Sequence, residues 1–207
     1  IKYMTAKEED ILTSQNLIKK GVVIDRVLDS LILTEGVKID DLILGDKNAV
    51  MVAARVLAYG PEYACNITNP KTGEPITHTF NLADCPFRKL PKDVTENLFE
   101  VTLPISKTKI KFSILSGKDE NLIEKDLKAS SKVGAVPPEL TTRLRYMIKE
   151  VDGDTSQSVI NDISQNMLAR DSMHLRKEIQ RVSPDIELEQ EIDIEGESVK
   201  VNIPMTV

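Results

Sequence analysis

The sequence predicts an α+β protein in which helical segments flank a small antiparallel β module built from hairpins. Apolar residues recur at helical spacing through the first 60 residues and then alternate with polar residues on either side of a turn at Gly73. A second alternating stretch, with its turn at Gly196, closes the chain. With 207 residues and a hydrophobic content of 41%, the chain can bury a sizeable core.

These changes of period divide the chain into four segments. They are a helical segment at 1–60, β hairpins at 61–115, a second helical segment at 116–182 and a C-terminal β hairpin at 183–207 that packs back on the first hairpin.

Helix boundaries follow from capping residues. Thr5 and Glu8 stand three apart and predict a capping box that opens one amphipathic helix ending at Gly21. Ser116 and Asp119 mark a helix start in the same way. The other predicted helices carry Val27 to Ile32 or span 48–59, 139–149, 156–168 and 171–182.

Composition and charge exclude several classes of partner. The formal net charge is -6, from 33 acidic and 27 basic side chains, which disfavours a protein that binds nucleic acid by neutralising phosphates. Aromatic residues make up only 4% of the chain and Trp is absent, so stacking platforms for bases and sugars are scarce. No apolar run reaches the roughly 18 residues that a membrane helix needs. We expect neither nucleic acid nor a membrane as a partner.

One short motif suggests catalysis. Asp152-Gly-Asp154 resembles the paired aspartates of haloacid-dehalogenase-type phosphatases, in which one carboxylate attacks phosphorus, so a phosphohydrolase using Asp152 and Asp154 is a remote alternative. However, Ile148–Val151 does not look like the buried apolar strand that such a motif follows, and a polar turn ending in a helix cap explains the residues. We therefore expect no catalytic residues and no enzymatic activity.

The few potential metal ligands are scattered. Cys65, His78 and Cys85 could supply three zinc ligands, but they lack the close Cys-x-x-Cys or His spacing of such sites. Two reduced thiols and a histidine on a strand surface are the predicted state, with no metal and no cofactor.

Two surfaces have open interpretations. His174 lies among basic residues that form either an acidic-partner surface or an ordinary solvated face. The strand Val199–Ile203 is either an edge that accepts a strand from another subunit or an edge covered within the fold. The basic residues around His174 are Arg170, Arg176, Lys177 and Arg181.

Several segments, in their given order, resemble the baseplate hub and hub-assembly family of T-even-like contractile-tailed phages. They span nearly the whole chain and are Met4–Thr13, Gly45–Ala49 leading to Tyr59-Gly60, Asn97–Glu100, Gly117–Glu120 and Val201–Val207. The resemblance implies a structural component of the virion tail baseplate that is assembled in the host cytoplasm. Its partners would be other baseplate and hub proteins, in a hetero-oligomeric assembly with several copies. The alternative within the family is a cytoplasmic chaperone for hub assembly that is absent from the mature virion.

The same resemblance bears on the hairpins. Some relatives carry Cys-x-x-Cys-Gly knuckles at two hairpin turns, which is the arrangement of a zinc ribbon. The corresponding positions here are Asn69, Thr72, Ile192 and Glu195, and these side chains cannot form a four-ligand zinc site. The resemblance therefore implies a module that is zinc-ribbon-like without metal and is held by apolar packing and backbone pairing.

Overall fold

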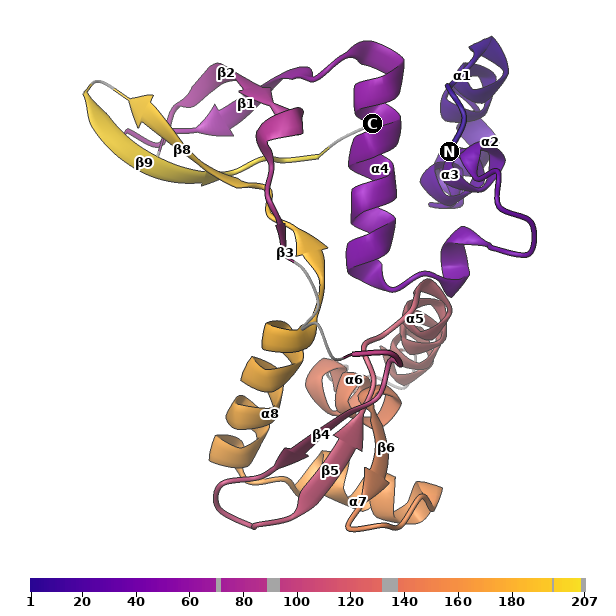
Figure 1. Ribbon diagram of the computed structural model, residues 1–207, viewed down its shortest axis with the longest axis vertical. Helices are drawn as coiled ribbons and strands as arrows, with labels where there is room; N and C mark the ends of the chain where they lie inside the picture. The colour runs from indigo at the N-terminus through magenta and orange to yellow at the C-terminus, as the bar shows by residue number, and fades with distance from the viewer. Residues whose placement is uncertain (70–71, 89–93, 132–137, 195, 206–207) are drawn as a thin grey trace. The chain divides into compact units, whose positions relative to one another are not determined.

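The computed structural model describes residues 1–69, 72–88, 94–131, 138–194 and 196–205. Helices are combined with small antiparallel sheets of two or three strands, which confirms the predicted α+β class (Figure 1). The chain divides into two compact units: a first unit of residues 1–88 and 184–207, and a second unit of residues 89–183. This division splits the predicted β segment at 61–115 between the two units.

In the first unit, helix α4 lies between the short N-terminal helices and the two hairpins (Figure 1). The elements of this unit are α1 (Ala6–Leu12), α2 (Gln15–Lys19), α3 (Val23–Leu31), η1 (Ile39–Asp41), α4 (Leu44–Tyr59), β1 (Glu62–Thr68), β2 (Pro75–Asn81), η2 (Leu82–Asp84), β3 (Phe87–Arg88), β7 (Asp185–Ile186), β8 (Glu189–Ile194) and β9 (Glu197–Asn202).

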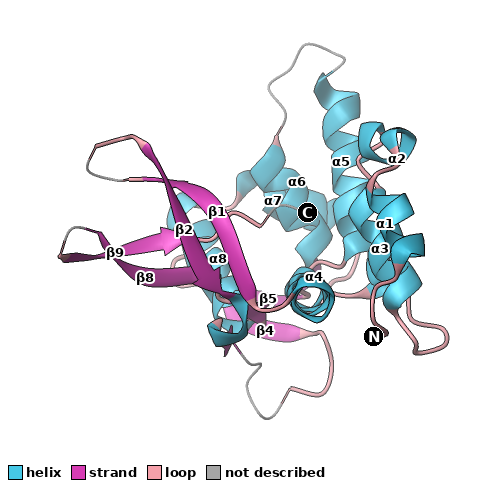
Figure 2. Cartoon of the chain, turned by 90° about the horizontal axis from the view of Figure 1, so that it is seen from above, coloured by secondary structure: helices cyan, strands magenta, loops and turns pink. Residues whose placement is uncertain are grey.

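The two hairpins of the first unit share one apolar core. Strand β1 pairs with β2 and β8 pairs with β9, both antiparallel, and the two hairpins lie side by side (Figures 1 and 2). Phe80 of the first hairpin is buried in the same cluster as Ile192 and Ile194 of the second. The hydroxyl of Tyr63 also donates a hydrogen bond to the carbonyl of Pro204 at 2.9 Å. A second hydrogen bond runs from the Gln190 amide of β8 to the Asn81 carbonyl of β2 at 3.2 Å, so apolar burial and side-chain hydrogen bonds join segments that are far apart in the sequence.

Helix α4 begins against the segment that returns the chain to the second hairpin. Gly45 is buried there, and a Cβ atom at this position would lie 1.8 Å from the carbonyl oxygen of Pro184. One turn further on, the Asn48 amide donates a hydrogen bond to Asp185 Oδ1 at 3.2 Å. Only a residue without a side chain fits at position 45, so Gly45 sets how closely these two segments approach.

The prediction of one helix from Thr5 to Gly21 is wrong. The structure has two helices, α1 and α2, separated at Thr13 and Ser14. The Thr13 hydroxyl donates back to the Glu9 carbonyl at 3.1 Å, and Ser14 is the N-cap of α2. Hydroxyl side chains that bond to nearby backbone groups favour helix ends over helix interiors, which explains the break.

The predicted partnership of Thr5 and Glu8 is present. The Glu8 carboxylate is fully buried and accepts hydrogen bonds from the Thr5 backbone N–H and from Lys2 Nζ, both at 2.9 Å. Hydrogen bonds from Thr5 and Lys2 lower the pKa of Glu8 from 4.5 to about 2. The folded state therefore favours the ionised carboxylate.

Acid should selectively remove the contribution of Glu8 to stability. Because the folded pKa is depressed, this contribution is complete above pH 4.5 and is lost as the pH falls towards 2. We expect Glu8→Gln to unfold at a lower temperature than the parent at pH 7 and at nearly the same temperature at pH 2. Thermal unfolding followed by circular dichroism across this range measures the difference. Glu35→Gln, at an exposed position, is the control. If the difference in unfolding temperature between Glu8→Gln and the parent does not narrow as the pH falls, the stabilising role of the Glu8 carboxylate is contradicted.

The second unit combines one three-stranded antiparallel sheet, ordered β4-β5-β6, with four helices in the described residues. Its elements are β4 (Phe99–Thr102), β5 (Lys109–Phe112), α5 (Gly117–Ser131), α6 (Glu139–Met147), β6 (Ile148–Val151), α7 (Gln157–Asn166) and α8 (Ala169–Val182).

Strand β6 was not predicted. The sequence reading extends helix 139–149 to Lys149, whereas α6 ends at Met147 and Ile148–Val151 pairs with β5. Ile148 and Val151 are buried and the two residues between them are not, so the segment is a half-polar edge strand. Pairing with a strand distant in sequence outweighs the local helical pattern here.

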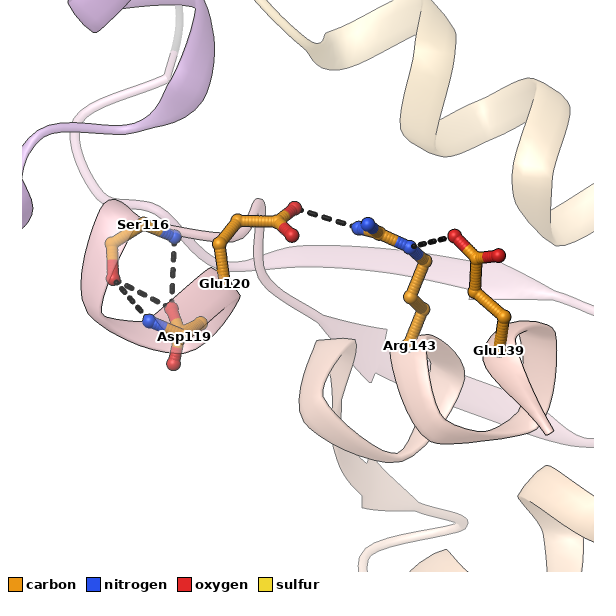
Figure 3. Close-up of polar contacts among 5 residues, drawn as sticks. All are labelled: Ser116, Asp119, Glu120, Glu139 and Arg143. Carbon is orange, nitrogen blue, oxygen red and sulfur yellow. Dashed lines mark hydrogen bonds and ion pairs between the residues drawn. The ribbon is translucent and has the colours of Figure 1, made fainter. Parts of the chain in front are cut away.

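The helix start predicted at Ser116 and Asp119 is confirmed (Figure 3). The Asp119 carboxylate accepts hydrogen bonds from the backbone N–H of Ser116 at 2.8 Å and from its hydroxyl at 2.7 Å, and the Asp119 N–H donates to the Ser116 hydroxyl. In the same view, Arg143 of α6 forms ion pairs with Glu120 of α5 and with Glu139. A reciprocal cap thus fixes the beginning of α5, and a charge pair links it to α6.

Removing the Ser116 hydroxyl should weaken the second unit by about 1 kcal/mol, the usual cost of losing a helix cap. We expect urea unfolding of Ser116→Ala to show this loss. Asn121→Ala, at an exposed position of the same helix, should change the free energy of unfolding by less than about 0.5 kcal/mol. Equal effects of the two substitutions would mean that the cap contributes nothing specific.

Candidate interaction site

The first unit contains an open, mainly apolar pocket with a volume of about 480 Å³. Helices α1, α3 and α4 and strand β1 all contribute to its wall. Its apolar lining includes Met4, Leu12, Ile24, Val27, Leu28, Met51, Ala54, Tyr63 and Met205. A pocket of this size and polarity is typical of sites that receive an apolar side chain or a small ligand.

Among the described residues that line the pocket, Arg55 is the one that carries a charge. Its Nη1 atom is buried and has no hydrogen-bond partner within the described part of the chain. The guanidinium lies 4.5 Å from the centre of the Tyr59 ring and 5.5 Å from that of Tyr63. Ring faces attract the cation, but they do not accept its N–H groups as an oxygen would.

The surroundings of Arg55 leave its charge uncompensated within the pocket. No Asp or Glu contributes to the described lining, and Cys65, which does, is a free thiol whose pKa is raised by burial. A neutral thiol adds apolar surface and no negative charge. The pocket therefore combines apolar walls with one cation able to accept an anionic partner.

Tyr59 extends this site to the surface. Its side chain is 51% exposed, although it lines the pocket, and its hydroxyl donates to Glu9 Oε1 at 3.5 Å. Exposed tyrosine beside arginine is a combination enriched among residues that dominate protein–protein binding energy.

The sequence reading did not single out Arg55, although a signal is present. Arg55 is the only charged residue between Lys47 and Glu62, in the middle of the apolar stretch 49–59 of helix α4. A lone arginine on a helix with apolar neighbours on both sides requires a partner or a solvent path, because an unpaired buried charge is costly.

The two aspartates of the hypothetical phosphatase motif form a turn. Asp152, at φ 50°, exchanges hydrogen bonds with Lys109: its N–H donates to the Lys109 carbonyl and its Oδ1 accepts from the Lys109 N–H, both at 2.8 Å. Asp154 Oδ1 accepts from the Ser156 N–H at 2.7 Å, and hydrogen bonds from the side chain and from the backbone of Ser156 lower the pKa of Asp154. Both carboxylates therefore accept hydrogen bonds from backbone N–H groups around the turn that follows β6.

The structure only partly gathers the potential metal ligands. Cys65 and His78 are opposite each other in the β1–β2 register, while Cys85 is buried and accepts a hydrogen bond from the Gln190 amide at 3.3 Å. Among the described residues, no three His, Cys, Asp or Glu side chains are placed to hold a metal ion.

The described positions among those that the resemblance compares with zinc knuckles have other contacts. The Asn69 carbonyl accepts from the Gly73 N–H at 2.8 Å, and the Thr72 hydroxyl accepts from the Glu74 N–H at 3.3 Å, so both residues stabilise the first hairpin turn. Ile192 is buried in the shared core of the hairpins. Glu195 lies outside the described residues.

The other two surfaces considered from the sequence lie on helix α8 and on strand β9. In helix α8, Arg170, His174, Lys177 and Arg181 recur at helical spacing; the charge of His174 acts on buried Asp171, and Arg181 pairs with Glu178. Within the described residues, strand β9 pairs with β8 alone, and Lys200 pairs with Glu189 across that hairpin.

In the part of the chain that the structure describes, none of the helices combines the length and the apolar character of a membrane span. Comparisons with protein-family models, with curated proteins and with solved structures find no match for this chain.

Proposed function

We propose that this chain is a non-catalytic structural component of the baseplate hub region of a contractile phage tail, acting through protein–protein interfaces. The observation that carries its binding role is the uncompensated guanidinium of Arg55 in an open apolar pocket. The link to phage tails rests on the sequence segments that resemble the baseplate hub family.

Residues in those segments have structural roles in the fold, which supports a scaffold rather than an enzyme. Glu8 is the buried partner of Thr5, and Gly45 allows the close approach to Pro184. Asn97 exchanges two hydrogen bonds of 2.8 Å with the backbone of Ile114, and Asp119 completes the cap of α5.

Quantitative mass spectrometry of gradient-purified phage particles and of infected-cell lysate tests the proposal. Stoichiometric presence in particles is expected for a baseplate component. Presence in lysate alone would overturn the structural role and favour the chaperone for hub assembly.

A further inference from the structure

We propose that the Arg55 pocket is a docking site for a segment of a partner protein in which a carboxylate lies next to a large apolar side chain. This inference deepens the proposed function and rests on it in taking the partner to be a protein. The preference of the pocket for an anion with an apolar neighbour does not depend on a role in phage assembly.

The requirement for an anion comes from charge complementarity. Arg55 has a buried Nη1 without a hydrogen-bond partner in the described chain, and no acidic side chain contributes to the described pocket lining. A buried polar group without a partner costs free energy, which an incoming oxygen acceptor recovers. A carboxylate fits best, because its two oxygens match the planar guanidinium fork.

The requirement for an apolar side chain next to the carboxylate comes from the walls of the pocket. Met51 and Met205 lie on the pocket surface together with aliphatic side chains of α3. Methionine side chains adapt to different apolar groups, as at other protein-binding surfaces. A volume of about 480 Å³ accommodates one large side chain together with the carboxylate.

A protein segment is favoured over a free small acid by the exposed rim. Tyr59 is 51% exposed where it borders the pocket and is held against the Arg55 guanidinium. A small ligand confined to the pocket would leave most of this ring in solvent, whereas a peptide that continues across the rim would cover it.

The first experiment probes the pocket with a matched pair of small molecules, 4-phenylbutyrate and its neutral amide. Methionine methyl groups labelled with ¹³C report binding by NMR in the full chain. Met4, Met51 and Met205 line the pocket, whereas Met147, Met167 and Met173 belong to the second unit and are internal controls. We expect the acid to shift only the pocket methyl signals and to bind at least tenfold more tightly than the amide.

Substitutions at Arg55 test whether its charge causes the preference for the acid over the amide. Arg55→Met keeps an apolar stem and should reduce the preference for the acid to less than twofold, while Arg55→Lys keeps the charge and should retain part of it. Dispersed signals from the three pocket methionines show that each variant is folded, and Arg55→Gln replaces Arg55→Met if that variant is not. Three results would overturn the proposal. They are equal affinity for the acid and the amide, no shift of the methyl signals with either compound, and a preference for the acid that survives loss of the Arg55 charge.

The second experiment identifies the source of the carboxylate. A photoreactive benzoylphenylalanine in place of Tyr59 is crosslinked in infected cells, and the attached peptide is sequenced by mass spectrometry. We expect a phage peptide in which Asp, Glu or a C-terminal carboxylate adjoins a large apolar residue, and we expect the product to disappear when Arg55→Met is added. Binding of the small acid without such a crosslinked product would overturn the inference that the partner is a protein. Failure of the acid to bind would overturn the pocket chemistry while leaving the particle measurement unaffected.

Discussion

Replacing Gly45 by alanine should destabilise the first unit by about 3 kcal/mol, although alanine is the better helix former. Helix propensity alone predicts a gain of about 1 kcal/mol for this substitution inside α4. The added Cβ, however, would lie 1.8 Å from the Pro184 carbonyl oxygen and 2.6 Å from its carbon. Backbone atoms of a packed segment cannot move aside as a flexible side chain can, so overpacking dominates and reverses the sign.

Urea unfolding gives the magnitude, and hydrogen exchange detected by mass spectrometry gives the location. Protection should fall in α4 and around Pro184, and it should stay unchanged in the second unit. Gly21→Ala is the matched control, because that glycine has φ +69° and nothing within 4 Å of its added Cβ. Its expected cost of about 1 kcal/mol reflects backbone strain alone. A neutral or stabilising Gly45→Ala would show that the two segments are not in close contact.

The Gly45 contact illustrates a limit of prediction from sequence. A helix was expected at 48–59, shortly after Gly45, but the reason for the glycine lies at Pro184, which follows the whole second unit in the sequence. Local signals such as capping residues and turn glycines predicted the starts of α1 and α5 and the two hairpins, because those contacts are made within a few residues. Contacts between distant segments have no local signature.

Buried polar contacts show the same limit. Asp171 is fully buried, and its carboxylate accepts hydrogen bonds from the N–H groups of Ile105 at 2.8 Å and Ser106 at 3.0 Å. Burial alone would raise its pKa, yet these bonds, with the charge of His174, lower it below the usual value. In the sequence, Asp171 is simply an acidic residue in the first turn of a helix, where negative charge is favoured anyway.

The sequence predicted the elements that form the candidate site but not the cavity between them. Alternation predicted that β1 would present one face to a core, and capping residues and helical spacing predicted a helix at 48–59, within α4. Neither pattern indicates that the helix and the strand leave a cavity between them or that Arg55 faces it without an acidic partner. The lone charge in an apolar helix was the available signal, and its meaning depends on tertiary packing.

Replacing Ile192 by alanine should destabilise the first unit by about 3 kcal/mol, within the range measured for truncating a buried isoleucine. Ile192 is 6% exposed and lies in the cluster that joins the two hairpins. Under the proposed family resemblance, this position would take the place of a cysteine in a zinc knuckle. If apolar packing holds the hairpins together in place of a metal, removing this side chain leaves a cavity where the hairpins meet.

Val199 provides the matched control, because it is opposite Ile192 in the β8–β9 register but only half-buried. Val199→Ala should cost about 1 kcal/mol, in proportion to the smaller apolar area that it loses. Incubation with EDTA should leave the thermal unfolding temperature of the parent protein unchanged, since a bound metal ion that stabilised the fold would lower that temperature when removed. A large loss of stability in EDTA, combined with a small effect of Ile192→Ala, would mean that a metal and not the shared apolar core holds the two hairpins. The opposite pair of results would assign to isoleucine packing the role that cysteine ligation has in a zinc ribbon.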